Sequence, residues 1–381
     1  MSRFVLTGAR LLTSDGFVEN RALVIADGVI EAIADTAPAG CERVALNGGD
    51  LLPGFIDAQV NGGGGVLFND QPTVAGIKAI GAAHRRFGTT GFLPTLISDD
   101  VAVMDRAIDA VEQAIAEKVP GVLGIHLEGP FLSPARAGIH DKSRFRVIDD
   151  ALIDRLTRLK GGCTVMTLAP ERAPPGAIRA LASKGVVVCA GHSAADYAAT
   201  VAALAEGVRG FTHLFNAMTP FTSREPGMVG AALNDAASWC GIIADLHHVH
   251  PASLAVALRA KPSDRFFLVT DAMSTVGSDQ KSFMLGDTKI TASGGRLTGP
   301  DGTLAGSDLD MAAAVRNMIA AVKVAPEDAV AMAASAPAGF LGMEAVRGRI
   351  APGLAADLVH VDRTAANGMA VLATWIGGMR A

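Results

Sequence analysis

Residues 121–128 read GVLGIHLE, a short apolar run that ends on a carboxylate. The chain holds eight runs of this kind, at residues 51–59, 89–94, 121–128, 163–169, 185–192, 209–214, 240–246 and 265–271. Their apolar stretches are nearly continuous rather than alternating, which is typical of parallel strands buried on both faces. Eight such strands, separated mostly by helical patterns, predict an α/β fold with a closed (β/α)8 barrel of the TIM type.

The segments between the runs favour this architecture. Asp99 and Asp100 can cap a helix that extends to Lys118, and residues 194–204 and 251–260 show the same helical spacing of apolar residues. The alternative is an open doubly wound sheet, but no G-x-G-x-x-G pattern follows the first run. Residues 281–306 interrupt the alternation. They are rich in Gly and Thr, and they predict a β-hairpin inserted after the eighth strand.

Both ends of the chain are rich in strand-forming residues. Asp27 and Gly28 separate two apolar runs and predict a tight hairpin turn, while residues 348–362 predict a turn followed by a strand. We therefore predict a small β-sandwich domain built from residues 1–50 and 346–381. The barrel domain is then expected to span residues 51–345.

Composition excludes several classes of protein. The 381 residues are 50% hydrophobic and 19% charged, so the chain can bury a large core. A formal net charge of -5 without a basic run argues against nucleic acid as a partner. The apolar runs are too short to span a membrane, and no signal peptide pattern opens the chain. Four widely spaced cysteines without a C-x-x-C pair predict reduced thiols in a cytoplasmic protein.

Ionisable side chains fall where predicted strands end, which is the face that carries the active site in TIM barrels. They are Glu128, His192, His213 and Asp271. One carboxylate and two imidazoles suit zinc or ferrous iron and leave room for water, which such a cation activates as a nucleophile. Asp271 then fits the role of a proton shuttle. The alternatives are structural, since either histidine could simply pack, Glu128 could join a buried ion pair, and Asp271 could cap the next segment.

Several motifs in a fixed order also carry a family resemblance. They are LLPGFIDAQVNGGGG (51–65), GIHLEGPFLSPARAGIH (124–140), AGHSAADY (190–197), GFTHLFNAMTPFTSREPG (210–227), LVTDAM (268–273), GTLAGSDLDM (302–311) and PGLAADLV (352–359). Together they resemble the N-acetylglucosamine-6-phosphate deacetylases of the amidohydrolase superfamily. The resemblance extends over nearly the whole chain, and it implies hydrolysis of N-acetylglucosamine 6-phosphate to glucosamine 6-phosphate and acetate.

The resemblance also implies a role for individual residues. Glu128, His192 and His213 match the metal ligands, and Asp271 matches the general base that later acts as general acid. His140 stands where the family polarises the acetyl carbonyl. The implied substrate contacts are Ile139, His140, Asn216, Ala217, Arg224, His248 and Leu304, with Arg224 and His248 on the phosphate side and Leu304 at the acetyl end. The family further implies a homodimer in which phosphate contacts are shared across subunits.

One departure from the wider superfamily bears on the cofactor. Many amidohydrolases carry His-x-His at the end of the first strand, but here Gln59 and Asn61 occupy those places and would be vestigial metal positions. The fourth run also ends without a lysine that could bridge two ions. We therefore expect one divalent ion per chain, zinc first, with iron, cobalt or manganese as alternatives.

Three questions stay open at this point. The chain could be an amidohydrolase acting on a different N-acylated sugar or amino compound, or a sugar-phosphate-binding regulator without catalysis. His126, two residues before Glu128, could support the ligands or belong to the barrel core. The run Gly62–Gly65 could admit a ligand close to the backbone or form a flexible turn.

Overall fold

The computed structural model describes residues 3–365 and 368–381. Its central sheet has eight parallel strands, each paired with the next along the chain: β8 (Phe55–Val60), β11 (Thr89–Ile97), β12 (Gly124–Glu128), β13 (Cys163–Leu168), β14 (Val187–Ala190), β15 (Gly210–Phe211), β16 (Trp239–Ile243) and β17 (Phe266–Val269). Each of the eight predicted runs contributes one of these strands, so the predicted barrel is confirmed.

The barrel closes where β8 meets β17, the two strands at the ends of the sheet. A parallel bridge joins Val60 to Ala272, and the amide N–H of Asp271 donates to the carbonyl of Gln59 over 3.0 Å. We call this junction the seam. It brings together residues that are more than 200 positions apart in the sequence, and it lies directly beside the predicted catalytic groups.

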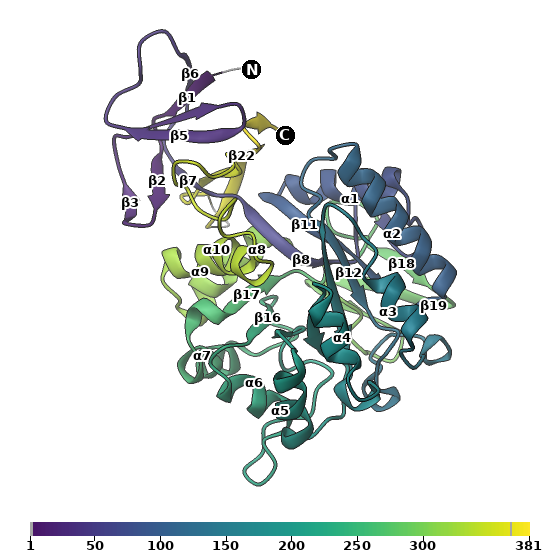
Figure 1. Cartoon of the computed structure of the whole chain (residues 1–381). Coiled ribbons are helices and arrows are strands. Elements are labelled where there is room, and N and C mark those ends of the chain that lie inside the picture. Colours follow the sequence, from purple (N-terminus) through teal and green to yellow (C-terminus); the bar gives the residue numbers. More distant parts are fainter. Residues whose placement is uncertain (1–2, 366–367) are drawn as a thin grey trace.

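Ten α-helices occur in the described residues and surround the barrel (Figure 1). They are α1 (Val74–Arg85), α2 (Val101–Ala116), α3 (Asp150–Leu156), α4 (Ala177–Ser183), α5 (Tyr197–Glu206), α6 (Gly227–Asn234), α7 (Pro251–Ala260), α8 (Met311–Asn317), α9 (Pro326–Ala333) and α10 (Ser335–Phe340). Short 3-10 turns lie at Pro134–Arg136, Lys142–Arg144, Pro170–Arg172 and Ser263–Arg265, and a π-helical turn lies at Met318–Val322. None of the described helices combines the length and apolarity that a membrane crossing requires.

The predicted insertion is present, but it is larger than a hairpin. Strands β18 (Ser282–Leu285), β19 (Thr288–Ser293) and β20 (Arg296–Thr298) form a three-stranded antiparallel sheet. Ile290 and Leu297 of this sheet pack with Met273 and Ala305, so the insertion is anchored to the segment that follows Asp271. A second small sheet pairs β9 (Gly62–Gly63) with β10 (Val66–Leu67).

The terminal segments form a sandwich of two sheets, as predicted, and both termini lie there (Figure 1). One sheet has the order β5 (Val29–Ala34), β4 (Ala22–Ala26), β1 (Arg3–Thr7), β6 (Glu42–Ala45), and the other β23 (Met379–Arg380), β22 (Ala370–Ile376), β21 (Leu358–Asp362), β7 (Asp50–Pro53), β2 (Arg10–Thr13), β3 (Gly16–Val18). Leu23, Leu358 and Trp375 pack in the core between them. The predicted hairpin turn has positive φ at Asp27 (53°) and Gly28 (82°), a conformation that this pair of residues favours.

The first predicted run is divided between the two sheets. Gly54 separates β7, which pairs with β21 and β2 in the terminal domain, from β8, which begins the barrel. A methyl group on Gly54 would lie 2.2 Å from the hydroxyl oxygen of Thr90, so the chain crosses between the domains where only glycine fits. The first six residues of the run, 51–56, contain no polar side chain, and both halves of the run are buried.

Candidate active site

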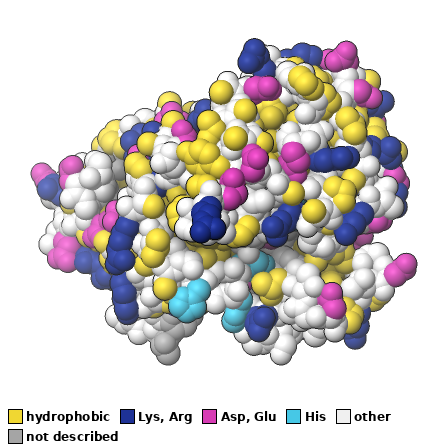
Figure 2. Space-filling view, turned by 90° about the horizontal axis from the view of Figure 1, so that it is seen from below, with side chains coloured by type: hydrophobic (Ala, Val, Ile, Leu, Met, Phe, Trp, Pro, Cys, Tyr) yellow, Lys and Arg dark blue, Asp and Glu magenta, His cyan; other side chains and the backbone are white. Residues whose placement is uncertain are grey.

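A cavity of about 240 Å³ opens at the carboxyl ends of the barrel strands, and all but two of the predicted site residues line it. Those that line it are Asn61, Glu128, Ile139, His140, His192, His213, Asn216, Ala217, His248, Asp271 and Leu304. Figure 2 shows histidine side chains gathered beside a hollow on one face of the molecule. The two exceptions are Gln59, which lies just behind the lining, and Arg224, which is exposed on the loop before α6.

Four of the lining residues have an unusual backbone conformation, and three of them, His192, His213 and Asp271, lie two positions after a strand ends. His192, His213, Ala217 and Asp271 all have positive φ, between 34° and 51°. Residues other than glycine adopt this conformation rarely, and it carries strain that functional sites tolerate when the surrounding structure enforces it. The left-handed residues that follow β14, β15 and β17 therefore distinguish the site by its backbone conformation as well as by its side chains.

Glu128, His192 and His213 converge on one point. Oε1 of Glu128 lies 3.2 Å from Nε2 of His192 and 2.9 Å from Nε2 of His213, and the two imidazole nitrogens are 3.0 Å apart. Burial alone would raise the pKa of Glu128, but the interactions of its carboxylate with the two neighbouring imidazoles hold that pKa well below its ordinary value. The carboxylate is therefore ionised at neutral pH and can act as a ligand.

This donor set fits a divalent cation. Nδ1 of His192 lies 2.8 Å from the carbonyl oxygen of Arg136, so it carries the proton and leaves Nε2 as a lone-pair donor. That lone pair faces the Glu128 carboxylate, and two acceptors at 3.2 Å repel each other unless a positive charge lies between them. One carboxylate and two imidazoles are ligands that zinc and other divalent transition metals accept.

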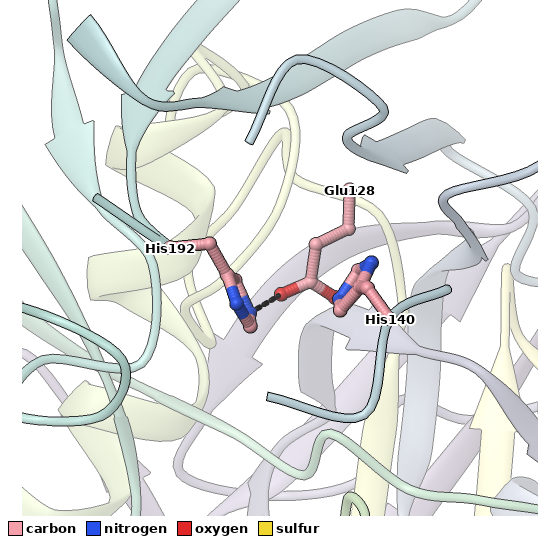
Figure 3. A group of neighbouring side chains, drawn as sticks. All are labelled: Glu128, His140 and His192. Atoms are coloured by element: carbon pink, nitrogen blue, oxygen red, sulfur yellow. Dashed lines mark hydrogen bonds and ion pairs between the residues drawn. The ribbon is translucent and has the colours of Figure 1, made fainter. Parts of the chain in front are cut away.

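His140 joins the same cluster from the loop after β12. One ligand atom each of Glu128, His140 and His192 lies within 4.8 Å of the others, and Figure 3 shows the three side chains pointing toward one another. The main-chain N–H of Ser98 donates to Nδ1 of His140 over 3.3 Å, and the Ser98 hydroxyl lies 2.8 Å from the same nitrogen. With Nδ1 accepting, the proton sits on Nε2, which makes His140 a hydrogen-bond donor rather than a fourth ligand.

Asp271 faces this cluster from the seam. Burial, together with the charge of Glu128, raises the pKa of Asp271 to about 6. Its Oδ1 accepts hydrogen bonds from Gln59 and Asn61, so the carboxylate is held in a fixed orientation. A carboxyl group whose pKa lies close to neutrality can both accept and return a proton, which is what a general base that later acts as an acid requires.

Within one chain, only one of the two residues predicted on the phosphate side lines the cavity. His248 lines the cavity, and its Nδ1 lies 2.6 Å from Oδ2 of Asp245. Arg224 is exposed and does not line this cavity, so the chain does not bring it to the other site residues. The roles of both residues stay predictions.

Two supporting residues were missed by the sequence interpretation. Asp245 orients His248 and also accepts the main-chain N–H groups of residues 247 and 248. It follows β16, so the rule that placed Asp271 at a strand end could have found it. Ser98, which contacts His140, follows β11 in the same way.

His126 belongs to a polar layer beneath the cluster. Its Nδ1 lies 3.1 Å from the hydroxyl of Thr95 and its Nε2 lies 2.8 Å from that of Thr167, which in turn bonds to Thr212 over 2.6 Å. Burial lowers the pKa of His126 to about 4, so the ring is neutral. The side chain is thus a hydrogen-bonded member of the barrel interior and does not line the cavity.

Known proteins match this chain over nearly its whole length. Residues 51–380 match the model of the amidohydrolase family. The chain belongs to the amidohydrolase family. This amidohydrolase is 44% identical to the N-acetylgalactosamine-6-phosphate deacetylase of Shewanella sp. (strain ANA-3), over 98% of this chain and 95% of that protein. It is 34% identical to the N-acetylglucosamine-6-phosphate deacetylase of Homo sapiens, over 98% of this chain and 93% of that protein.

A solved structure agrees with these relatives. A mutant of the Mycobacterium smegmatis N-acetyl-D-glucosamine-6-phosphate deacetylase, in complex with N-acetyl-D-glucosamine-6-phosphate, superposes on this amidohydrolase with a TM-score of 0.90 and 32% identity. The match covers 100% of this chain and 99% of the other. The resemblance predicted from the sequence motifs is therefore confirmed at the level of the family.

Proposed function

We propose that this amidohydrolase removes the acetyl group from an N-acetylhexosamine 6-phosphate and releases acetate and the amino sugar phosphate. The observation that carries the proposal is the convergence of Glu128, His192 and His213 on one point, with Asp271 and His140 facing the same cavity. Relatives that match nearly the whole chain are named as deacetylases of such substrates, which supports the same chemistry here.

Glu128, His192 and His213 would hold one divalent ion. When bound, such an ion polarises an oxygen and lowers the pKa of water, so that hydrolysis proceeds near neutral pH. Zinc is our first candidate, with iron, cobalt and manganese as alternatives that the same ligands accept. Gln59 and Asn61 offer amides in place of a second set of imidazoles, which supports one ion per chain.

The remaining residues divide the work of substrate binding and proton transfer. His140 donates from Nε2 to the acetyl carbonyl and stabilises the negative charge that develops on its oxygen. Asp271 takes a proton from the attacking water and returns it to the departing amine. Leu304 would border the acetyl group, while Ile139, Asn216, Ala217 and His248 would contact the sugar phosphate.

The configuration of the sugar at C4 has two candidates. The motifs predict the gluco epimer, and the relative from Homo sapiens supports it at 34% identity. The relative named for the galacto epimer is more similar, at 44% identity. N-acetylgalactosamine 6-phosphate is therefore a candidate substrate of equal standing.

We also propose that two chains associate through the face formed by α6 and α7. Phe221 is 65% exposed and Val256 59% exposed, and they border a hollow that is largely apolar. An apolar hollow bordered by exposed apolar side chains is a candidate for such an interface. Arg224 lies on the loop that carries Phe221, so association here would let Arg224 serve the partner's phosphate site.

Location in the cytoplasm stays a prediction from the sequence.

A substrate panel tests the proposal. Purified protein of known metal content is given N-acetylglucosamine and N-acetylgalactosamine, each with and without a 6-phosphate, and the release of free amine is measured. We expect turnover of at least one phosphorylated sugar and much slower turnover of the free sugars. Binding of the phosphorylated sugars without turnover, on metal-loaded protein, would instead identify a non-catalytic regulator.

A further inference from the structure

We propose that the side-chain amides of Gln59 and Asn61 form a clamp that fixes the orientation of Asp271, which makes both of them positioning residues for the reaction. The inference rests on the proposed function, because it assigns a role within the same site. It replaces the expectation that these two positions are only vestigial.

The geometry of the clamp is defined by three hydrogen bonds. Oδ1 of Asp271 accepts from Nδ2 of Asn61 over 2.7 Å and from Nε2 of Gln59 over 3.0 Å. The same nitrogen of Gln59 also donates to Oε2 of Glu128 over 3.2 Å. A primary amide has two N–H donors, so one nitrogen can serve both carboxylates. Gln59 and Asn61 are each only 2% exposed, so solvent does not compete for these bonds.

The clamp leaves the other oxygen of each carboxylate available. Glu128 presents Oε1 to His192 and His213 while Oε2 faces Gln59. Asp271 receives both amides on Oδ1, so Oδ2 is the oxygen that can exchange a proton. Each carboxylate is thus anchored by one oxygen and acts through the other.

Neutral donors suit the space between two buried carboxylates. Buried lone pairs need hydrogen-bond partners, and the two amides supply such partners to both carboxylates. An amide keeps the same protonation state at every physiological pH, so it orients Asp271 without taking its proton. Imidazoles at these positions would introduce groups that titrate and that bind metal ions themselves.

The main chain around the clamp is anchored independently. Asp57 accepts hydrogen bonds from the hydroxyl of Thr270 over 2.5 Å, from the N–H of Thr270 over 3.2 Å and from the N–H of Gln59 over 3.2 Å. Asp57, Gln59 and Asn61 alternate along the strand, so their side chains share its inner face. The seam therefore fixes both backbones, and the clamp sets the last torsion angles, those of the Asp271 side chain.

Asn61 and Gln59 differ in one respect that the test can use. Asn61 lines the cavity, and its Oδ1 is buried without a hydrogen-bond partner among the described residues, so Asn61 can also contact a substrate. Gln59 does not line the cavity. A change at Gln59 therefore reports on the carboxylates alone.

The test removes the donors while keeping the shape. Gln59→Met and Asn61→Leu are compared with the unaltered protein in kcat, in KM for the preferred N-acetylhexosamine 6-phosphate and in bound metal. Gln113→Met is the matched control, since Nε2 of Gln113 donates to Oε1 of Glu117 over 2.9 Å on the exposed face of α2. We expect kcat of Gln59→Met to fall about 10–100-fold with KM within about threefold, because misorientation affects the chemical step. Metal content should not change, and the control should behave like the unaltered protein.

The outcomes separate the possible roles. Unchanged kcat in Gln59→Met or in Asn61→Leu would overturn the clamp. A fall in kcat that only follows a loss of metal would also overturn it, since the amides would then retain the ion rather than orient Asp271. If Gln59→Met does not fold, Asn61→Leu carries the test through the split between kcat and KM, since loss of a substrate contact would raise KM. An unaltered protein that turns over neither phosphorylated sugar would refute the proposed function, and the clamp with it, before any variant is compared.

Discussion

Replacing Asp271 with asparagine should separate the chemical role of this residue from its structural one. Asn keeps Oδ1, so the hydrogen bonds from Gln59 and Asn61 can form as before. It cannot accept a proton from water. We therefore expect the Asp271→Asn protein to fold, to bind its metal and to lose a factor of about 10²–10⁴ in kcat, equivalent to about 3–5 kcal/mol of transition-state stabilisation.

The same substitution should stabilise the metal-free protein at alkaline pH. The pKa of Asp271 is raised by burial and by Glu128 to about 6, against an ordinary value of 3.8. A carboxyl group with a raised pKa takes up protons on folding, so the free energy of unfolding falls as the pH rises from about 4 through about 6. Asn removes this loss. The gain at pH 8 is at most about 3 kcal/mol, from about 1.4 kcal/mol per pKa unit.

Two assays check this prediction. Turnover and metal content are measured on the same metal-loaded samples, and urea unfolding of metal-free protein is followed between pH 4 and pH 8. We expect the stability difference between the variant and the unaltered protein to shrink toward zero at the acidic end. Near-normal turnover by folded, metal-loaded Asp271→Asn protein would remove Asp271 from the mechanism. Loss of the metal would instead make it a ligand.

Three further substitutions address the other parts of the site. His192→Asn should lose both bound metal and turnover while circular dichroism shows a folded chain; retained metal would exclude His192 as a ligand. Arg224→Ala should impair turnover of the phosphorylated sugar far more than that of the free sugar, and equal losses would mean that Arg224 only supports its loop. Ser98→Ala removes one hydrogen bond to His140 and should lower kcat/KM about fivefold, since one such bond contributes about 1 kcal/mol; an unchanged kcat/KM would show that the bond to the Ser98 main chain is enough.

The sequence pattern was sufficient to predict the barrel, because the burial of each strand determines the residue types within that strand. A parallel strand covered on both faces needs an apolar side chain at nearly every position, and runs such as 163–169 show this without knowledge of their partners. The sequence specifies the length and the boundaries of an element less closely. The sequence of 281–306 predicts one hairpin, but the segment has three strands. Its apolar residues pack on Met273, and the sequence pattern does not show this contact between segments.

The local sequence accounts for the position of some side chains at the candidate site and not of others. The position of Glu128, His192, His213 and Asp271 beside one cavity could be predicted, because each lies where a predicted strand ends. Asp245 and Ser98 satisfy the same rule but lack a distinctive motif, so they were found only through their contacts with His248 and His140. Arg224 matched a motif, yet the fold of one chain leaves it on the surface.

The amino-acid sequence by itself determined the family, the eight strands and the set of groups that face the cavity, because these depend on residue types at local spacings. Only the tertiary structure decided which groups Gln59 and Asn61 contact. In the sequence they are amides at positions where many amidohydrolases carry histidine ligands. Closure of the barrel brings them within 3.0 Å of Asp271, some 210 residues away. Such contacts depend on the register of two strands across the seam, which no local pattern encodes.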